Sequence, residues 1–223
     1  MYISCQALQK QYMVDKQPIF AANDINLDID RNDFVTILGH SGSGKTTLLS
    51  LIGGLAAPDS GKVLIDGKDV RNGNDKKISQ MRNETIGFIF QFASLIPTLT
   101  AFENLLLPLS FSGRKEDGLK KAAQLLHEVG LSEKRNCFPA ELSGGQQRRV
   151  AIARAFMNDP QIILADEPTG DLDEETEFEI MKLFYERHQQ GTTFVIVTHN
   201  SQLAQGHDAL RVLQMKNGSL QEQ

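Results

Sequence analysis

The stretch LGHSGSGKTTLL, residues 38–49, contains three glycines, two serines and one lysine between apolar segments. It follows FVTIL at 34–38, a continuous apolar run typical of a strand buried on both faces. LLSLIGGL at 48–55 then predicts a helix that frays at its glycines. The order of strand, glycine-rich loop and helix predicts a phosphate-binding loop. Glycines let successive backbone N–H groups converge on an anion, and the helix N-terminus adds partial positive charge.

The loop fits the pattern G-x-x-x-x-G-K-[ST] at Gly39, Gly44, Lys45 and Thr46. In such a loop Lys45 reaches the β- and γ-phosphates, and the Thr46 hydroxyl binds Mg²⁺. A chance match by a glycine-rich turn is the alternative, and the flanking strand and helix argue against it. The residues expected to contact a nucleotide here are Gly39, His40, Ser41, Gly42, Ser43, Gly44, Lys45, Thr46 and Thr47.

The segment IILADEP, residues 162–168, supplies the carboxylates that a phosphate loop needs. Its apolar run ends at Asp166, so this carboxylate is expected at the C-terminal edge of a buried strand, where ligands of α/β sheets collect. Asp166 is expected to hold Mg²⁺ through water, and Glu167 to polarise an attacking water molecule. An ordinary acidic turn at a strand end is the alternative.

A second glycine pair precedes a predicted helix in LSGGQQRR, residues 142–149. Ser143 is a good N-cap, and the exposed amides of Gly144 and Gly145 could bind an anion. Taken alone, the motif fits an ordinary capped helix equally well. Arg148 and Arg149 are expected on a face of this helix, with Arg149 pairing with local carboxylates.

The composition is globular, and the length suits one large domain spanning residues 1–223 or two small lobes. A formal net charge of -5 provides no global basic surface, so no nucleic-acid partner is expected. Cys5 and Cys137 lie far apart and are expected to be free thiols in a reducing compartment. The N-terminus lacks the order of a signal peptide, and the densest apolar run is short and contains Pro108. Any membrane role is therefore expected to come through a partner.

Strand-rich segments bracket a mostly helical insert at 92–158, which leaves 1–91 and 159–223 for the core and a β part. The alternation of strands and helices implies a parallel sheet covered on both faces. Capping residues at 100–103 predict the start of one helix. The strands are predicted at 24–30, 34–38, 62–66, 68–70, 86–90, 162–165, 193–197 and 210–215, and the other helices at 115–129, 143–157 and 174–189.

These motifs, in this order, resemble those of the ATP-binding-cassette (ABC) ATPases. GHSGSGKT resembles Walker A, Gln91 in FIFQ the Q-loop, LSGGQQRR the ABC signature, and IILADEP Walker B. TGDLD at 169–173 resembles the D-loop, and His199 in IVTHN the switch histidine. The resemblance covers nearly the whole chain. It implies an α/β P-loop NTPase (RecA-like) core with a parallel sheet, an N-terminal antiparallel β subdomain and an inserted helical subdomain.

The resemblance also implies ATP and Mg²⁺ as ligands, and a head-to-tail homodimer that sandwiches two ATP molecules. The residues expected to act in catalysis are Glu167, His199, Gln91 and Lys45, and those expected at the metal are Thr46, Gln91 and Asp166. Ser143, Gly144, Gly145 and Gln146 would contact the ATP of the other subunit, and Asp173 would help join the two sites. Tyr12 would stack on adenine, although packing on a sheet is its alternative.

Within this family, residues 82–109 resemble the subgroup of macrolide-exporter, lipoprotein-releasing and cell-division ATPases. LLSLIGGL and VTHNSQLA are more similar to the lipoprotein-releasing and exporter members. The implied partner is an integral membrane permease with a periplasmic domain, and the implied location is the cytoplasmic face of the inner membrane. The function implied is export or extraction of a substrate, and one alternative is control of a periplasmic activity without transport. A soluble ATPase of DNA repair or translation is the other alternative, which the lack of a long coiled-coil insert or a second cassette in this sequence and its acidity disfavour. The chain departs from the family pattern at His40 and Asn200. It also departs at Arg148, the position at which many relatives have glutamine.

Overall fold

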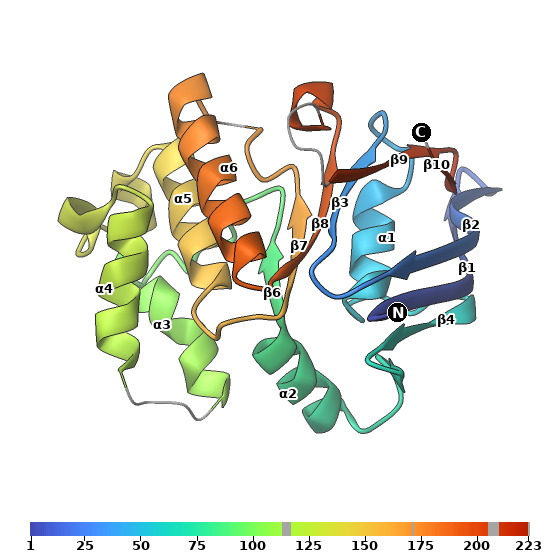
Figure 1. Cartoon of the computed structure of the whole chain (residues 1–223), viewed down its shortest axis with the longest axis horizontal. Helices are drawn as coiled ribbons and strands as arrows, with labels where there is room; N and C mark the ends of the chain where they lie inside the picture. The colour runs from blue at the N-terminus through green and yellow to red at the C-terminus, as the bar shows by residue number, and fades with distance from the viewer. Residues whose placement is uncertain (113–116, 171, 205–209, 223) are drawn as a thin grey trace.

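The computed structural model describes residues 1–112, 117–170, 172–204 and 210–222 (Figure 1). Six of the described strands form one sheet in the order β10-β9-β3-β8-β7-β6. Neighbouring strands run parallel from β9 to β6, and β10 pairs antiparallel with β9. Their bounds are β3 (Phe34–Leu38), β6 (Ile86–Ile89), β7 (Ile162–Asp166), β8 (Thr193–Thr198), β9 (Leu210–Lys216) and β10 (Ser219–Glu222).

A second, antiparallel sheet has the order β2-β1-β4-β5. Its strands are β1 (Ile3–Val14), β2 (Gln17–Ile29), β4 (Ser60–Ile65) and β5 (Lys68–Asp69). Asp66 and Gly67 form the turn that joins β4 to β5, which correspond to the strands predicted at 62–66 and 68–70. The sequence did not indicate β1, because shifts in its pairing register with β2 and β4 interrupt the alternation of polar and apolar residues.

Successive residues of the parallel strands face two different cores, because side chains of a strand alternate between its faces. Val35, Leu164 and Val195 pack with α1 (Lys45–Ile52) and the antiparallel sheet. Phe34 and Phe194 face the other side, where they pack with the remaining helices. The predicted parallel sheet covered on both faces is therefore confirmed, with α1 on one side and α5 and α6 on the other (Figure 1).

The helices beyond α1 are α2 (Asp75–Thr85), α3 (Ala101–Ser112), α4 (Gly118–Glu128), α5 (Gly144–Ala155) and α6 (Glu174–Gln189). The capping box that opens α3 is confirmed, because the Thr100 backbone N–H donates to Glu103 at 2.8 Å and the Glu103 N–H donates to Thr100 Oγ1 at 3.2 Å. The sequence did not indicate α2, which buries none of its residues and therefore shows no apolar period.

Helices α3, α4 and α5 lie between β6 and β7 in the chain, where the sequence predicts a helical insert. They pack against one another, and α5 also packs against β6. The division at 92–158 into a separate subdomain stays a prediction. Within the described parts of the chain, no helix combines the length and the hydrophobicity needed to cross a bilayer.

Candidate functional site

The glycine-rich loop leaves the end of β3 and turns directly into α1. Gly39 N–H donates to the Thr198 carbonyl of the neighbouring strand β8 at 3.3 Å. Gly44 is the N-cap of α1 with a φ of 106°, in the left-handed region that favours glycine. A Cβ atom at this position would lie 2.0 Å from the Ala21 carbonyl oxygen of β2. The close approach of loop and β2 therefore requires glycine at position 44.

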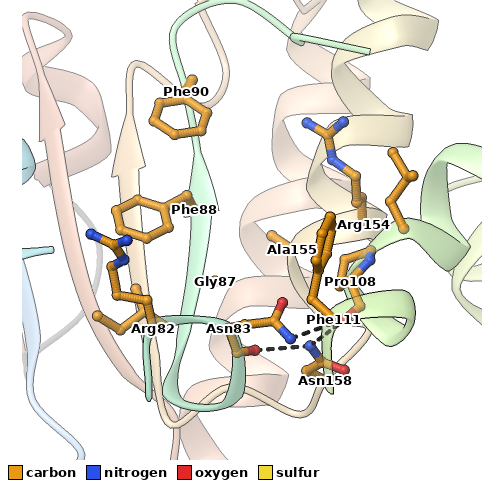
Figure 2. A pocket seen from close by; sticks show the side chains of 12 residues that line it. Arg82, Asn83, Gly87, Phe88, Phe90, Pro108, Phe111, Arg154, Ala155 and Asn158 are labelled. Carbon is orange, nitrogen blue, oxygen red and sulfur yellow. Dashed lines mark hydrogen bonds between the residues drawn. The ribbon is translucent and has the colours of Figure 1, made fainter. Parts of the chain in front are cut away.

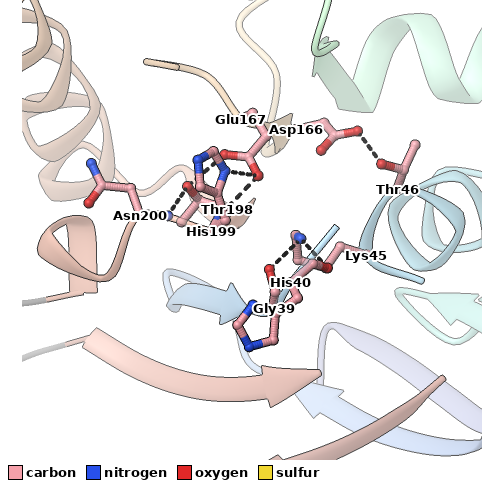
Figure 3. A network of polar contacts seen from close by, with 9 residues as sticks. All are labelled: Gly39, His40, Lys45, Thr46, Asp166, Glu167, Thr198, His199 and Asn200. Atoms are coloured by element: carbon pink, nitrogen blue, oxygen red, sulfur yellow. Dashed lines mark hydrogen bonds and ion pairs between the residues drawn. The ribbon is translucent and has the colours of Figure 1, made fainter. Parts of the chain in front are cut away.

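Three adjacent parallel strands carry the candidate residues to one edge of the sheet. β3 leads into the loop, and β8 leads to His199. The last residue of β7 is Asp166, and Glu167 follows it directly. Figure 3 shows Lys45, Thr46 and the two acidic residues around the same space. They belong to a cavity of about 690 Å³, which is lined by Tyr12, Val14, Ile19, Ala21, His40, Ser41, Gly42, Gly44, Lys45, Thr46, Thr47, Gln91, Asp166, Glu167 and His199.

Lys45 lies in the concave part of the loop and is only 7% exposed. Its ammonium group donates to the carbonyl oxygens of Gly39 at 2.6 Å and His40 at 3.2 Å. Both acceptors are neutral backbone carbonyls, whereas the donor is the charged side chain of Lys45. The ammonium can therefore exchange them for an anionic phosphate oxygen, which forms a stronger, charge-assisted hydrogen bond.

Thr46 and Asp166 form the candidate magnesium site. Thr46 Oγ1 donates to Asp166 Oδ2 at 2.6 Å, so a hydroxyl and a carboxylate already lie together. Burial raises the pKa of Asp166, and the hydrogen bond from Thr46 opposes this shift. Among the described residues, no cluster of three or more His, Cys, Asp or Glu side chains could hold a metal. The pair nevertheless fits Mg²⁺, which commonly takes one or two protein oxygens together with substrate phosphates and water.

Glu167 is held in a fixed orientation beside this pair. Its φ of 47° lies in the left-handed region, which is sparsely populated by residues other than glycine. Its Oε2 accepts from Thr198 Oγ1 at 2.8 Å, and its Oε1 accepts from the His199 backbone N–H at 3.0 Å. Thr198 is 1% exposed and its hydroxyl also accepts from the Asn200 N–H at 3.0 Å. Sequence reasoning missed Thr198, although its place between a buried strand and His199 was a usable signal.

Tyr12 lines the cavity. It belongs to β1, pairs with Ile19 of β2, and is 46% exposed. Val14, Ile19 and Ala21 extend the apolar wall around it, and sequence reasoning missed all three. An aromatic ring exposed on an apolar wall offers a face on which a flat heteroaromatic base can stack.

Some predicted residues lie outside the cavity lining. Gly39 and Ser43 shape the loop, and the Ser43 N–H donates to the His40 carbonyl at 3.1 Å. Asp173 is the N-cap of α6, where it accepts from Thr176 N at 3.0 Å and Thr176 Oγ1 at 2.8 Å. These hydrogen bonds lower the pKa of Asp173. The predicted D-loop also contains Asp171, which lies outside the described residues.

The predicted second anion site is at the start of α5, also outside this cavity. Ser143 and Gln146 form a capping box, with the Gln146 N–H donating to Ser143 Oγ at 3.3 Å and the Ser143 N–H donating to Gln146 Oε1 at 3.0 Å. Ser143 and Gly144 are exposed, and a Cβ atom at Gly144 would meet no atom within 4 Å. The helix start is therefore open toward solvent, and Gly145 is partly exposed next to it.

Arg148 lies on a face of α5, as predicted, but this face is buried and not open to solvent. Arg148 is 2% exposed, and its guanidinium donates to the backbone carbonyls of Phe90 and Gln91. Arg149 donates to the Val129 carbonyl at 3.1 Å. Sequence reasoning could not place Arg148, because its acceptors are backbone groups about 57 residues away along the chain.

A parallel sheet, a glycine-rich loop at a helix start and carboxylates at adjacent strand ends define a P-loop nucleotide hydrolase. A family model described as ABC transporter matches residues 22–170. The chain belongs to this family and is an ATP-binding, ATP-hydrolysing subunit that uses Mg²⁺. The P-loop NTPase fold predicted from the sequence is confirmed.

Relatives and a solved structure cover nearly the whole chain. The lipoprotein-releasing system ATP-binding protein LolD of Aquifex aeolicus is 46% identical over 88% of this chain and 87% of that protein. The macrolide export ATP-binding/permease protein MacB of Bdellovibrio bacteriovorus is 41% identical over 98% of this chain and 33% of that protein. The dimeric ATP-binding cassette MJ0796, bound to ADP and Pi in a post-hydrolysis state, matches with a TM-score of 0.92 and 40% identity, covering 99% of this chain and 98% of that one.

Proposed function

We propose that two copies of this chain bind two ATP molecules between them and drive a membrane permease that exports or extracts a substrate. One observation carries this proposal. Within one chain, the cavity around Lys45 and the open helix start at Ser143 are separate anion-binding features. A second copy placed head to tail would bring the helix start of one chain to the phosphates held by the other. The dimeric cassette with a TM-score of 0.92 supports this arrangement.

The proposed binding roles follow from the cavity. Tyr12 stacks on the adenine, the loop from Gly39 to Gly44 surrounds the phosphates with backbone N–H groups, and Lys45 contacts the β- and γ-phosphates. Thr46, Thr47 and His40 lie along the same wall. Thr46 and Asp166 hold Mg²⁺, with Gln91 at the edge of the same cavity. When bound, the metal neutralises charge on the phosphate oxygens.

Hydrolysis in this proposal requires a water molecule aligned with the γ-phosphate. Glu167 orients this water and accepts its proton as the oxygen attacks phosphorus and the bond to the β-phosphate oxygen breaks. His199 turns from Glu167 toward the γ-phosphate, and Lys45 stabilises the charge that develops on the transferring group. Loop amides that are already oriented in the free protein reduce the reorganisation needed at this step.

The γ-phosphate also controls the dimer. It contacts Lys45 of one copy and Ser143, Gly144, Gly145 and Gln146 of the other, with Asp173 near the junction. A ligand shifts an equilibrium only by its differential contacts with the two states, and the γ-phosphate makes such contacts only in the closed dimer. Hydrolysis removes these contacts and allows the dimer to open.

The permease is proposed to dock at a groove between β6, α3 and α5. Figure 2 shows Phe88 and Phe90 on one side of this groove and Pro108 and Phe111 on the other. The side chains of Phe111 and Phe92 are 75% and 77% exposed, and apolar exposure of this extent marks an interaction surface. Phe90 lines this groove, and the next residue in the chain, Gln91, lines the ATP cavity. The groove and the ATP cavity are therefore connected through these two consecutive residues.

We place the protein at the cytoplasmic face of the inner membrane, attached through a permease with a periplasmic domain. Pull-down of the chain from its native membranes, followed by identification of the co-purifying integral protein, tests this placement. Transport of the substrate class of that permease in reconstituted vesicles then separates transport from control of a periplasmic activity. ATP-dependent transport supports the proposal. ATP hydrolysis that changes a periplasmic activity without any transport contradicts it.

The nucleotide site itself is tested by Lys45→Ala. This variant removes the charge that contacts the phosphates, so it should weaken ATP binding in an equilibrium titration. Lys182→Ala, a change on α6 away from the cavity lining, is the matched control and should bind ATP like the unmodified chain. Equal ATP affinity of all three proteins would contradict the proposed site.

A further inference from the structure

Two arginines of α5 bind the backbone of residues 90–94, which we name the glutamine segment because it contains Gln91. The guanidinium of Arg148 donates to the carbonyl oxygens of Phe90 and Gln91. Arg154 donates from Nη2 to the Ala93 carbonyl and from Nη1 to the Ser94 carbonyl, both at 2.9 Å. One helix therefore holds the glutamine segment through charge-assisted hydrogen bonds on both sides of Phe92.

The geometry of Arg148 makes this contact specific. A buried guanidinium is costly unless its N–H groups find acceptors, and at 2% exposure Arg148 uses two consecutive carbonyls. The planar fork of arginine donates to both acceptors in a fixed relative geometry, which the rotatable ammonium group of lysine does not impose.

The position of Arg148 on α5 connects two functional features. The same helix begins at the exposed cap of Ser143 and Gly144, while the segment that Arg148 holds carries Gln91 into the cavity. We propose that Arg148 is a positioning residue for ATP hydrolysis, which holds the Gln91 backbone to α5 so that Gln91 follows the helix start when that start engages the ATP of the other copy. This inference rests on the proposed function, in particular on the roles of Gln91 and Ser143.

Arg148→Met tests the proposal in the purified full chain, because methionine keeps the aliphatic volume and removes every donor. We expect kcat for ATP hydrolysis to fall about 10-fold with KM for ATP changed less than about threefold, since a misplaced catalytic contact slows the chemical step more than it weakens binding. Arg148→Gln restores one amide donor and should have an intermediate kcat. Arg149→Met, on the same helix but bonded to the Val129 carbonyl, should stay within about twofold of the unmodified kcat.

A double-variant cycle with Gln91→Ala separates positioning from general support of the fold. If Arg148 acts through Gln91, adding Arg148→Met to Gln91→Ala should change kcat by less than about twofold. Two results would overturn the inference. One is a kcat for Arg148→Met equal to that of the unmodified chain, with only the thermal midpoint lowered. The other is a double variant in which the two single effects multiply.

Failure of the proposed function gives a different result. Normal turnover in Glu167→Gln would overturn the catalytic roles themselves and this inference with them. Normal turnover in Arg148→Met, together with loss of turnover in Glu167→Gln, would overturn the inference alone.

Discussion

Nδ1 of His199 lies 2.8 Å from Oε1 of Glu167, and the backbone N–H of His199 donates to the same oxygen at 3.0 Å. The His199 side chain is 69% exposed, whereas that of Glu167 is only 12% exposed. The histidine ring therefore has room to turn, while the carboxylate is held by its neighbours. In the proposed cycle this contact joins the two residues before ATP arrives, and the γ-phosphate competes with Glu167 for His199.

Glu167→Gln should lower ATP turnover by at least about 100-fold, because glutamine cannot accept a proton from the attacking water. ATP affinity should be unchanged, since Glu167 has no proposed contact with the nucleotide base or the loop. Steady-state hydrolysis and an equilibrium ATP titration measure the two effects. Glu174→Gln, an exposed change in the first turn of α6, provides the control. Near-normal turnover of Glu167→Gln would remove this residue from its role.

Thr198→Val should lower kcat about 10-fold with little change in ATP affinity, because Glu167 loses a donor that orients its carboxylate. The free energy of unfolding should also fall by about 1 kcal/mol, since the partly buried Asn200 N–H loses the Thr198 hydroxyl as an acceptor. Thr198→Ser keeps the hydroxyl and serves as the control. If valine and serine gave the same kcat, the hydrogen bond to Glu167 would have no catalytic importance.

Asp166→Asn should abolish the stimulation of hydrolysis by Mg²⁺, because the amide is a poor ligand for a hard cation. The same change should stabilise the nucleotide-free chain at neutral pH. Burial raises the pKa of Asp166 in the folded protein, so folding disfavours its ionised form. The stability advantage of asparagine should shrink as the pH falls through this raised pKa, where the folded chain protonates Asp166. Denaturation at several pH values measures this difference, and a lower free energy of unfolding for Asp166→Asn than for the unmodified chain at neutral pH would refute the prediction.

Phe194→Ala should lower the free energy of unfolding by about 3–5 kcal/mol through the cavity that it creates. Phe194 is fully buried in β8, with its ring 5.1 Å from that of Phe34 and 5.3 Å from that of Phe184. Phe178→Ala on α6 removes a side chain that is 72% exposed and should change stability by less than about 0.5 kcal/mol. Urea denaturation compares the two variants, and equal effects would contradict the assigned core.

The central strands and the loop could be predicted from the sequence because their requirements are local. FVTIL must be buried on both faces, and the glycine and lysine spacing expresses the needs of a phosphate loop. The convergence of Asp166 and His199 with this loop also follows, since all three continue parallel strands. In contrast, β1 carries many polar residues and irregular register, and α2 has no buried face, so neither shows a clear period.

Other features depend on partners far away in the chain and have no local sequence signal. Burial of Arg148 depends on the carbonyls of Phe90 and Gln91, and no pattern within α5 reveals these acceptors. The hydrogen bond from Thr198 to Glu167 likewise depends on the pairing of β7 with β8. Such contacts fix the orientation of site residues, which is the part of the site that motif spacing leaves open.

The central claim is that the loop of one chain and the Ser143 helix start of another hold the same triphosphate. Sedimentation of Glu167→Gln with Mg²⁺ and ATP tests it most directly, with Ser143→Arg added in a second protein and Ser132→Arg, an exposed site elsewhere, added in a third. We expect ATP-dependent dimers of the first and third proteins and monomers of the second. Equal ATP-dependent dimerisation of all three proteins would contradict the account.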